Sequence, residues 1–161
     1  MDNGLSMTFE AADSREAQQC LRAYYAELNA RFAGGFALDK APSPDMAAMT
    51  PPRGAFVIAR LAGHAVACGA LTTLAPGIGE IKRVWVSPQA RGRGVASRLM
   101  DALEARASSL GLRTLRLDTN RALAEAHGMY LRRGYRPIAA YNDNPYADHW
   151  FERHLEEQPG P

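Results

Sequence analysis

Cysteine is scarce in this sequence, because the 161 residues include only Cys20 and Cys68. Two cysteines cannot form the disulfide framework of a small secreted domain, and both have apolar neighbours. We therefore expect buried, reduced thiols and a reducing, cytoplasmic compartment. His64 and His127 do not stand at metal-ligand spacing from cysteines or carboxylates, so no metal site is predicted.

Long apolar runs and a strong charge excess are also absent. Met1-Asp2-Asn3-Gly4 lacks the basic region and apolar core of a signal peptide, and no membrane span is predicted. The formal net charge of +2 is too small to indicate a nucleic-acid partner. With 47% hydrophobic and 22% charged residues, the composition is typical of a globular chain. We expect a single domain over residues 1–161, with a frayed tail at 156–161.

Hydrophobic periodicity predicts a mixed α/β (α+β) sheet with helices on both faces. A first helix should lie between Asp13 and Gly34, with Asp13 and Glu16 as a capping box. The other expected helices cover 95–110 and 121–133, with one turn at 45–49. The expected strands cover 5–11, 54–61, 64–74, 80–86, 114–118, 135–141 and 149–155. Short turns make the second to fourth strands an antiparallel meander, and the helix at 95–110 makes the next strand parallel to the fourth.

The most informative stretch runs from Gly79 to Leu99. It reads as a strand, a turn containing Gly92 and Gly94, and a helix that begins at Val95. Backbone N–H groups at such a turn lack helical partners, and the positive end of the helix dipole favours phosphate. The surrounding arginines, Arg91, Arg93 and Arg98, add positive charge. This stretch is therefore predicted to bind an anion.

Three phosphate-binding designs share such a glycine turn. A nucleotide P-loop requires Lys and then Ser or Thr, where this chain has Val95-Ala96. A dinucleotide fingerprint requires a third glycine where Ser97 stands, so NAD binding by an oxidoreductase is a weaker alternative. An RNA-binding arginine-glycine segment would be longer and repeated.

The turn resembles a known family. Gln89-x-x-Gly92-x-Gly94, followed by Val95-Ala96, is similar to the Gln/Arg-x-x-Gly-x-Gly/Ala motif of the GNAT acyl-CoA N-acyltransferases. The segments 80–86, 117–120 and 129–135 resemble that family's fourth strand, the end of its fifth strand and the helix that closes its cofactor site. The segment 141–152 resembles a tail found in a bacterial subset of the family. The resemblance implies a GNAT-like fold, in which an antiparallel meander precedes a βαβ unit.

The resemblance also implies a cofactor and a reaction. The cofactor would be acetyl-CoA, and the reaction would be direct attack of a primary amine on its acetyl group. The backbone from Arg91 to Ser97 would bind the pyrophosphate, and the strand edge from Val84 to Val86 would pair with the pantetheine arm. The cofactor-binding residues implied in this way are Val84, Trp85, Val86, Gln89, Arg91, Gly92, Arg93, Gly94, Val95, Ala96, Ser97, Asn120 and Tyr130.

Two residues match catalytic positions of the family. Glu80 would take the proton of the attacking ammonium, directly or through water, and Tyr130 would protonate the departing thiolate. Glu80 has an alternative reading as a strand-end carboxylate paired with Lys82 or an arginine. Tyr130 has one as a core aromatic of its helix. His149 and Asp143 are the next candidates for the base.

The segment from Tyr141 to Glu152 combines amides, carboxylates and aromatics. Asp143 with Tyr146 or Trp150 could hold an ammonium group by charge and ring face, and His149 is a further acceptor candidate. The alternative is an Asx-rich turn with Trp150 in the core. We expect Asn142 and Asn144 to serve the turn.

The acceptor is expected to be a small-molecule or peptide amine, and neither nucleic acid nor membrane is expected as a partner. The resemblance leaves the oligomeric state open, a homodimer being one state that relatives adopt. A non-catalytic acyl-CoA-binding module is the alternative function. It would retain the anion site and would not need Glu80 or Tyr130.

Overall fold

The computed structural model describes residues 4–37 and 46–155. The predicted tail at 156–161, and Asp45 of the predicted helical turn, lie outside the described residues. The strands are β1 (Leu5–Phe9), β2 (Gly54–Leu61), β3 (His64–Ala75), β4 (Ile78–Val86), β5 (Thr114–Thr119), β6 (Arg136–Ile138) and β7 (His149–His154). The helices are α1 (Arg15–Arg31), α2 (Val95–Ser109) and α3 (Ala124–Arg132), with short 3₁₀ turns η2 (Ala47–Met49) and η3 (Pro88–Ala90).

The seven described strands form one mixed sheet in the order β1-β2-β3-β4-β5-β7-β6. The antiparallel meander β2-β3-β4 and the parallel pairing of β4 with β5 confirm the prediction. The final strand, β7, lies between β5 and β6, and it is antiparallel to both. The strand end at 119 and the loop before β7 are therefore neighbours.

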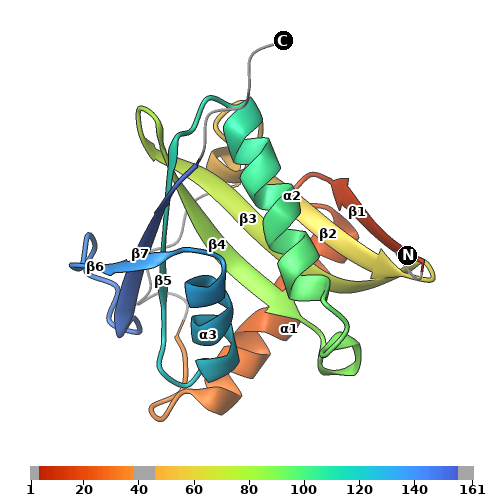
Figure 1. Cartoon of the computed structure of the whole chain (residues 1–161). Coiled ribbons are helices and arrows are strands. Elements are labelled where there is room, and N and C mark those ends of the chain that lie inside the picture. The colour runs from red at the N-terminus through yellow and green to blue at the C-terminus, as the bar shows by residue number, and fades with distance from the viewer. Residues whose placement is uncertain (1–3, 38–45, 156–161) are drawn as a thin grey trace.

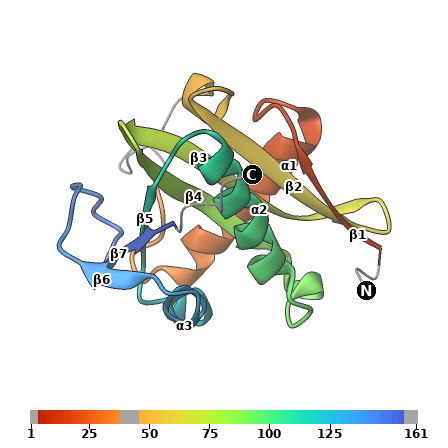
Figure 2. The same ribbon diagram turned by 45° about the horizontal axis from the view of Figure 1, so that its top comes forward.

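Helices cover both faces of the sheet (Figures 1 and 2). Alternate residues of β2 explain this arrangement, since Val57 belongs to the buried cluster that includes α2, whereas Phe56 belongs to the cluster that includes α1. Both side chains are at most 1% exposed. Tyr130 of α3 belongs to the same cluster as α2, so α2 and α3 share one face.

The pairing of β3 with β4 contains a β-bulge. The register between β3 and β4 shifts opposite Gly69, and Arg83 has a φ of 59° there. A bulge bends its strand and increases the local twist. In the described chain, β4 and β5 are paired from Ile78↔Thr114 to Glu80↔Arg116 and no further. Figure 1 shows the two strands spreading apart beyond this point.

Several element ends differ from the sequence prediction. Ser14, not Asp13, caps α1, because its Oγ accepts the N–H of Ala17 at 3.1 Å. The helix α3 begins at Ala124 rather than at residue 121, because the Asn120 side chain forms a turn by accepting the N–H of Ala122. The strand expected at 135–141 is limited to β6, whose Pro137 has no N–H to donate to a ladder.

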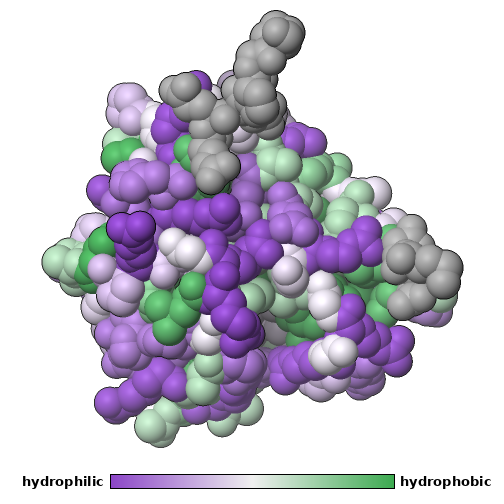
Figure 3. All heavy atoms as spheres, viewed as in Figure 1, coloured by the Kyte–Doolittle hydropathy of each residue, from purple (hydrophilic) through white to green (hydrophobic). Residues whose placement is uncertain are grey.

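The described helices are too short or too polar to cross a bilayer. The face that carries α2 and α3 is covered mostly by hydrophilic side chains, with smaller hydrophobic patches between them (Figure 3). Cys20 and Cys68 are both buried free thiols, as predicted.

Candidate functional site

A groove with a volume of about 460 Å³ opens beside the glycine turn. Its walls come from β4, the turn into α2, the side of α3, and α1. The predicted cofactor residues that line it are Val84, Trp85, Val86, Arg91, Gly92, Gly94, Val95, Ala96 and Ser97. Arg132 lines both this groove and an adjoining hollow that contains Arg133 and Arg153. Gln89 and Arg93 do not line the groove.

The glycine turn fits a phosphate group. Gly92 and Gly94 have φ values of 78° and 74°, in the left-handed region that favours glycine, and Gly94 is the N-cap of α2. A Cβ added at either glycine would meet no protein atom within 4 Å. Close packing is therefore not the reason for these glycines. The positive φ requires them, and the absence of a side chain leaves space in which a ligand can approach the backbone. Gly94 has no side chain to cap the first N–H groups of α2, so these groups and the positive end of the helix dipole are suited to bind an anion.

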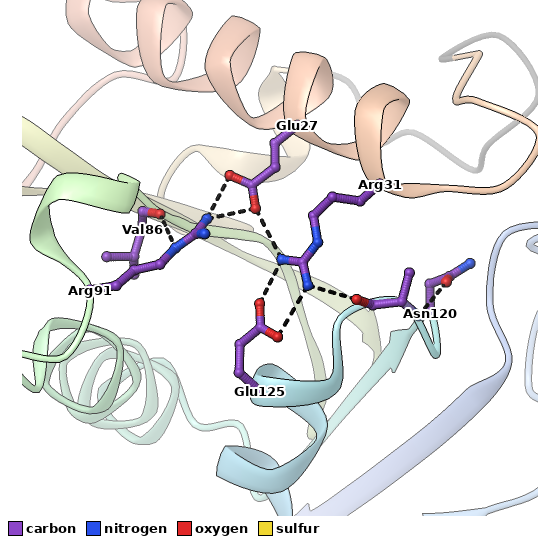
Figure 4. A network of polar contacts seen from close by, with 7 residues as sticks. Glu27, Arg31, Val86, Arg91, Asn120 and Glu125 are labelled. Atoms are coloured by element: carbon purple, nitrogen blue, oxygen red, sulfur yellow. Dashed lines mark hydrogen bonds and ion pairs between the residues drawn. The ribbon is translucent and has the colours of Figure 1, made fainter.

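An ion-pair network crosses the groove (Figure 4). Glu27 of α1 accepts Arg91 Nη2 at 2.6 Å, and Arg91 Nε donates to the Val86 carbonyl at 3.1 Å. Arg31, one turn further along α1, contacts Glu27 at 3.2 Å and Glu125 of α3 at 2.6 Å. Side chains of α1 thus connect the glycine turn on one wall of the groove to α3 on the other.

A second cavity, of about 110 Å³, adjoins the groove. The two cavities share Tyr24, Leu28 and Val84 among their lining residues. The second cavity lies where β4 and β5 separate, since it is lined by Lys82 on one strand and Asp118 on the other. The structure therefore places a small chamber next to the groove.

Tyr130 lines this chamber and is 6% exposed. Its ring packs edge-on against Tyr135, at 5.8 Å between centroids. Burial, followed by the negative charge of Asp118, raises the pKa of the Tyr130 phenol well above its ordinary value. The phenol is therefore protonated at neutral pH and can act as a donor. Among the described residues, no group hydrogen-bonds its hydroxyl.

Glu80 lies beside the chamber rather than on its wall, and it is 5% exposed. Its carboxylate pairs with Lys82 at 3.3 Å and accepts the Tyr141 hydroxyl at 2.5 Å. The ion pair with Lys82 is the one that the alternative reading of Glu80 requires. Burial and the charge of Glu80 raise the pKa of Tyr141, so this hydroxyl keeps its proton.

The structure separates the candidate acceptor residues. Tyr146 lines the chamber, whereas Asp143 is exposed and lines neither cavity. His149 packs against His127 with 4.5 Å between ring centroids, and Trp150 Nε1 donates to Asn142 Oδ1 at 3.0 Å. Neither His149 nor Trp150 lines a cavity.

Asn120 lies at the end of β5 and lines the chamber, not the groove. Its Nδ2 donates to the Tyr146 carbonyl at 2.7 Å, and its Oδ1 accepts the N–H of Ala122. Both ends of the amide thus hold neighbouring backbone. This contact joins the end of β5 to the segment that precedes β7.

Sequence reasoning missed two parts of the chamber. Asp118 lies in the segment 117–120, which the sequence assigned only to the end of a strand, yet this residue lines the chamber. Its signal was the alternation in β5, which buries Leu117 toward one face and places Asp118 on the other. The second part is aromatic, since Tyr25 of α1 and the residues Phe32 and Phe36 that follow this helix line the chamber.

Comparison with known proteins agrees with this geometry. The model of the acetyltransferase (GNAT) family matches residues 10–135. An IAA acetyltransferase from Azospirillum brasilense is 33% identical over 107 residues, which are 64% of this chain and 70% of that protein.

Solved structures are also similar. A protein from Klebsiella pneumoniae assigned as an acyl-CoA N-acyltransferase is 28% identical, with a TM-score of 0.76 over 94% of this chain and 98% of that one. A GNAT family acetyltransferase from Elizabethkingia anophelis, solved with acetyl-CoA bound, is 14% identical, with a TM-score of 0.66 over 95% of this chain and 99% of that one. The second likeness is one of fold.

Proposed function

Because the chain belongs to the GNAT acetyltransferase family, we propose that it transfers the acetyl group of acetyl-CoA to the nitrogen of a primary amine. One observation carries the proposal: the uncapped, left-handed glycine turn at the start of α2 opens on a groove that ends beside Tyr130. A phosphate site at one end and a phenol donor at the other suit a long cofactor with a reactive thioester. The acetyl-CoA bound by the Elizabethkingia protein and the name of the Azospirillum relative support the same donor.

In this proposal the backbone N–H groups of the glycine turn bind the pyrophosphate. The edge of β4 at Val84 and Trp85 binds the pantetheine arm, since both residues line the groove and β5 has already turned away. When bound, the cofactor supplies an activated acetyl group. Tyr130 donates its proton to the departing thiolate sulfur, for which its protonated phenol is suited.

The amine must lose a proton before it attacks, because alkylammonium groups have a pKa of about 10.4. We assign this proton to Glu80. Since the Glu80 carboxylate is 5% exposed and does not line the chamber, a water molecule must carry the proton to it. The buried free thiols of Cys20 and Cys68 support a reducing, cytoplasmic location for the reaction.

The proposal is tested by mixing the purified protein with acetyl-CoA and a panel of amines, following free thiol and identifying the acetylated amine by mass spectrometry. Thiol release that depends on the amine is expected. Tight binding of acetyl-CoA without turnover would instead establish the non-catalytic alternative.

Gly94→Glu tests the phosphate site itself. A glutamate side chain would bring negative charge into the space reserved for phosphate, so acetyl-CoA binding measured by calorimetry should be lost. Gly77→Glu is a matched control, because Gly77 has a φ of 78°, open space around its Cβ position and a place in the β3–β4 turn. Equal affinities of the two variants would contradict the assignment.

A further inference from the structure

Within the acetyl transfer proposed above, on which this inference rests, we propose a class of acceptor. It is a monoamine with an aromatic or apolar body, whose ammonium group contacts Asp118 and whose body packs against Phe32, Phe36 and Tyr146.

Asp118 lies at the point where the sheet opens. Glu80 and Arg116 form the last register pair between β4 and β5 in the described chain, and Asp118 lies two residues beyond it. Strand alternation places Asp118 on the same face as Arg116, away from the buried Leu117. Its carboxylate lines the chamber together with Tyr130. An ammonium group held by Asp118 would therefore occupy the same chamber as the proposed proton donor.

The charge of Asp118 has no cationic partner among the described residues. The carboxylate is half-buried and accepts Asn142 Nδ2 at 2.8 Å and Asn144 Nδ2 at 3.3 Å, both of them neutral amides. Lys82, which lines the chamber from the opposite strand, pairs with Glu80. A cation would compensate the charge of this partly desolvated carboxylate, and the chamber is where such a cation can approach it.

The amides that hold Asp118 are themselves held in place. Trp150 Nε1 donates to Asn142 Oδ1 at 3.0 Å, and the Tyr146 N–H donates to Asn144 Oδ1 at 3.1 Å. Both Asn side chains are therefore oriented with their NH₂ groups toward Asp118. The segment before β7, which the sequence suggested for acceptor binding through Asp143, acts instead by orienting Asp118.

Part of the chamber wall is aromatic. The Phe36 and Tyr146 rings lie 4.9 Å apart, and the Phe32 and Tyr146 rings lie 5.7 Å apart. The Tyr146 hydroxyl accepts the N–H of Ala37 at 2.8 Å. This hydrogen bond joins the segment after α1 to the loop between β6 and β7. Such a surface is suited to an aromatic or aliphatic group and to the ring face that an ammonium prefers.

Charge disfavours amines that carry several positive charges. Lys82 and Arg83 also line the chamber, and they repel a second positive charge. A polyamine is therefore disfavoured, and an amine with one charge is favoured.

The test compares kcat/KM for 2-phenylethylamine, hexylamine, spermidine and kanamycin at saturating acetyl-CoA. We expect the first two to exceed the other two by at least ~10-fold, which corresponds to about 1.4 kcal/mol. Preference for spermidine or kanamycin would overturn the inference and leave acetyl transfer intact. Thiol release with none of the amines and no acetyl-CoA binding would instead remove the proposed function.

Variants of Asp118 separate charge from shape. Asp118→Asn should raise the KM for 2-phenylethylamine by ~10-fold or more and leave the KM for acetyl-CoA within twofold, because it removes the charge and keeps the size. Asp143→Asn removes an exposed carboxylate of the same segment and is the matched control, with both constants unchanged. Equal KM values for the amine in the two variants would overturn the assignment.

The aromatic wall has its own test in case Asp118→Asn lowers the folded fraction. Phe36→Ala should raise the KM for hexylamine, and Phe36→Leu should restore it, since Leu again offers apolar surface at the chamber. An unchanged KM in Phe36→Ala would remove the aromatic wall from the proposal.

Discussion

Replacing Glu104 should destabilise the face that carries Tyr130 more than any neighbouring surface change. Glu104 of α2 accepts Arg133 Nη2 at 2.6 Å, Tyr135 Oη at 2.8 Å and Arg153 Nη1 at 3.0 Å. Its side chain is 11% exposed and that of Arg133 is 13% exposed, so both charges are largely desolvated. This one carboxylate therefore joins α2 to the end of α3 and to β7.

The magnitude follows from these exposures. Removing one partner of a buried ion pair costs about 3–5 kcal/mol. The loss is reduced here because Arg153 is 31% exposed and Arg133 keeps its contact with Asp101 at 2.6 Å. We expect Glu104→Ala to lower the free energy of unfolding by about 2–3 kcal/mol, allowing for this partial exposure. For a chain of this size that lowers Tm by roughly 5–10 °C.

The assay is thermal unfolding followed by circular dichroism, with urea unfolding to verify that the m-value is unchanged. Asp101→Ala is the matched control, because it removes a second carboxylate from the same arginine and the same helix. The Asp101 side chain is 68% exposed, so its loss should cost less than about 1 kcal/mol. A Glu104→Ala shift no larger than that of Asp101→Ala would refute the reasoning.

Further predictions concern catalysis and pH. Tyr130→Phe should lower kcat by ~100-fold with little change in the KM for acetyl-CoA; a steady-state change within twofold would assign the ring to packing. Glu80→Gln should change the pH profile of kcat/KM, and an intact profile would place the base elsewhere. The hydrogen bond from Arg60 lowers the pKa of Glu10 from its ordinary value of 4.5, so this residue stabilises the fold above that pH and the contribution is lost as the pH falls through the lowered value. Glu10→Gln should therefore weaken the fold at pH 7 and make its acid destabilisation shallower, as measured by urea unfolding at several pH values.

Local sequence signals predicted the meander and the glycine turn. Ala62-Gly63 between two β-rich runs predicted the hairpin, and both residues have the positive φ values that such a turn requires. Gly92 and Gly94 indicated the anion site for the same reason. These features depend on residues that are adjacent in the chain, so the sequence contains what is needed to predict them.

The parts that were missed depend on contacts between distant segments. The position of β7 between β5 and β6 depends on pairing across the sheet, which no local pattern specifies. The bulge at Arg83 places a non-glycine residue at positive φ, against its own preference, and tertiary packing decides it. The chamber beside Asp118 exists because residues of α1, which is far away in the sequence, form part of its wall.

The start of α3 could not be predicted from the local sequence either. A helix from residue 121 satisfied the hydrophobic pattern, but the Asn120 amide contacts the Tyr146 carbonyl, which is 26 residues away. Asn side chains compete with helices by binding nearby backbone, so the first turn of the expected helix became a loop. The correction matters for the site because Asn120 lines the chamber.

Under the proposed function, the early end of the ladder between β4 and β5 would make the stability of this chain depend on the concentration of acetyl-CoA. In the described chain, the pairing of β4 with β5 ends at Glu80 and Arg116. A ligand that hydrogen-bonds to the backbone beyond this point does so only in the folded state, so it stabilises the fold. Under the proposed function, acetyl-CoA at 100 times its Kd would add about 2.7 kcal/mol to folding by mass action. A cell that runs short of acetyl-CoA would therefore expose this protein to its proteases, and the amount of protein would follow the supply of its donor.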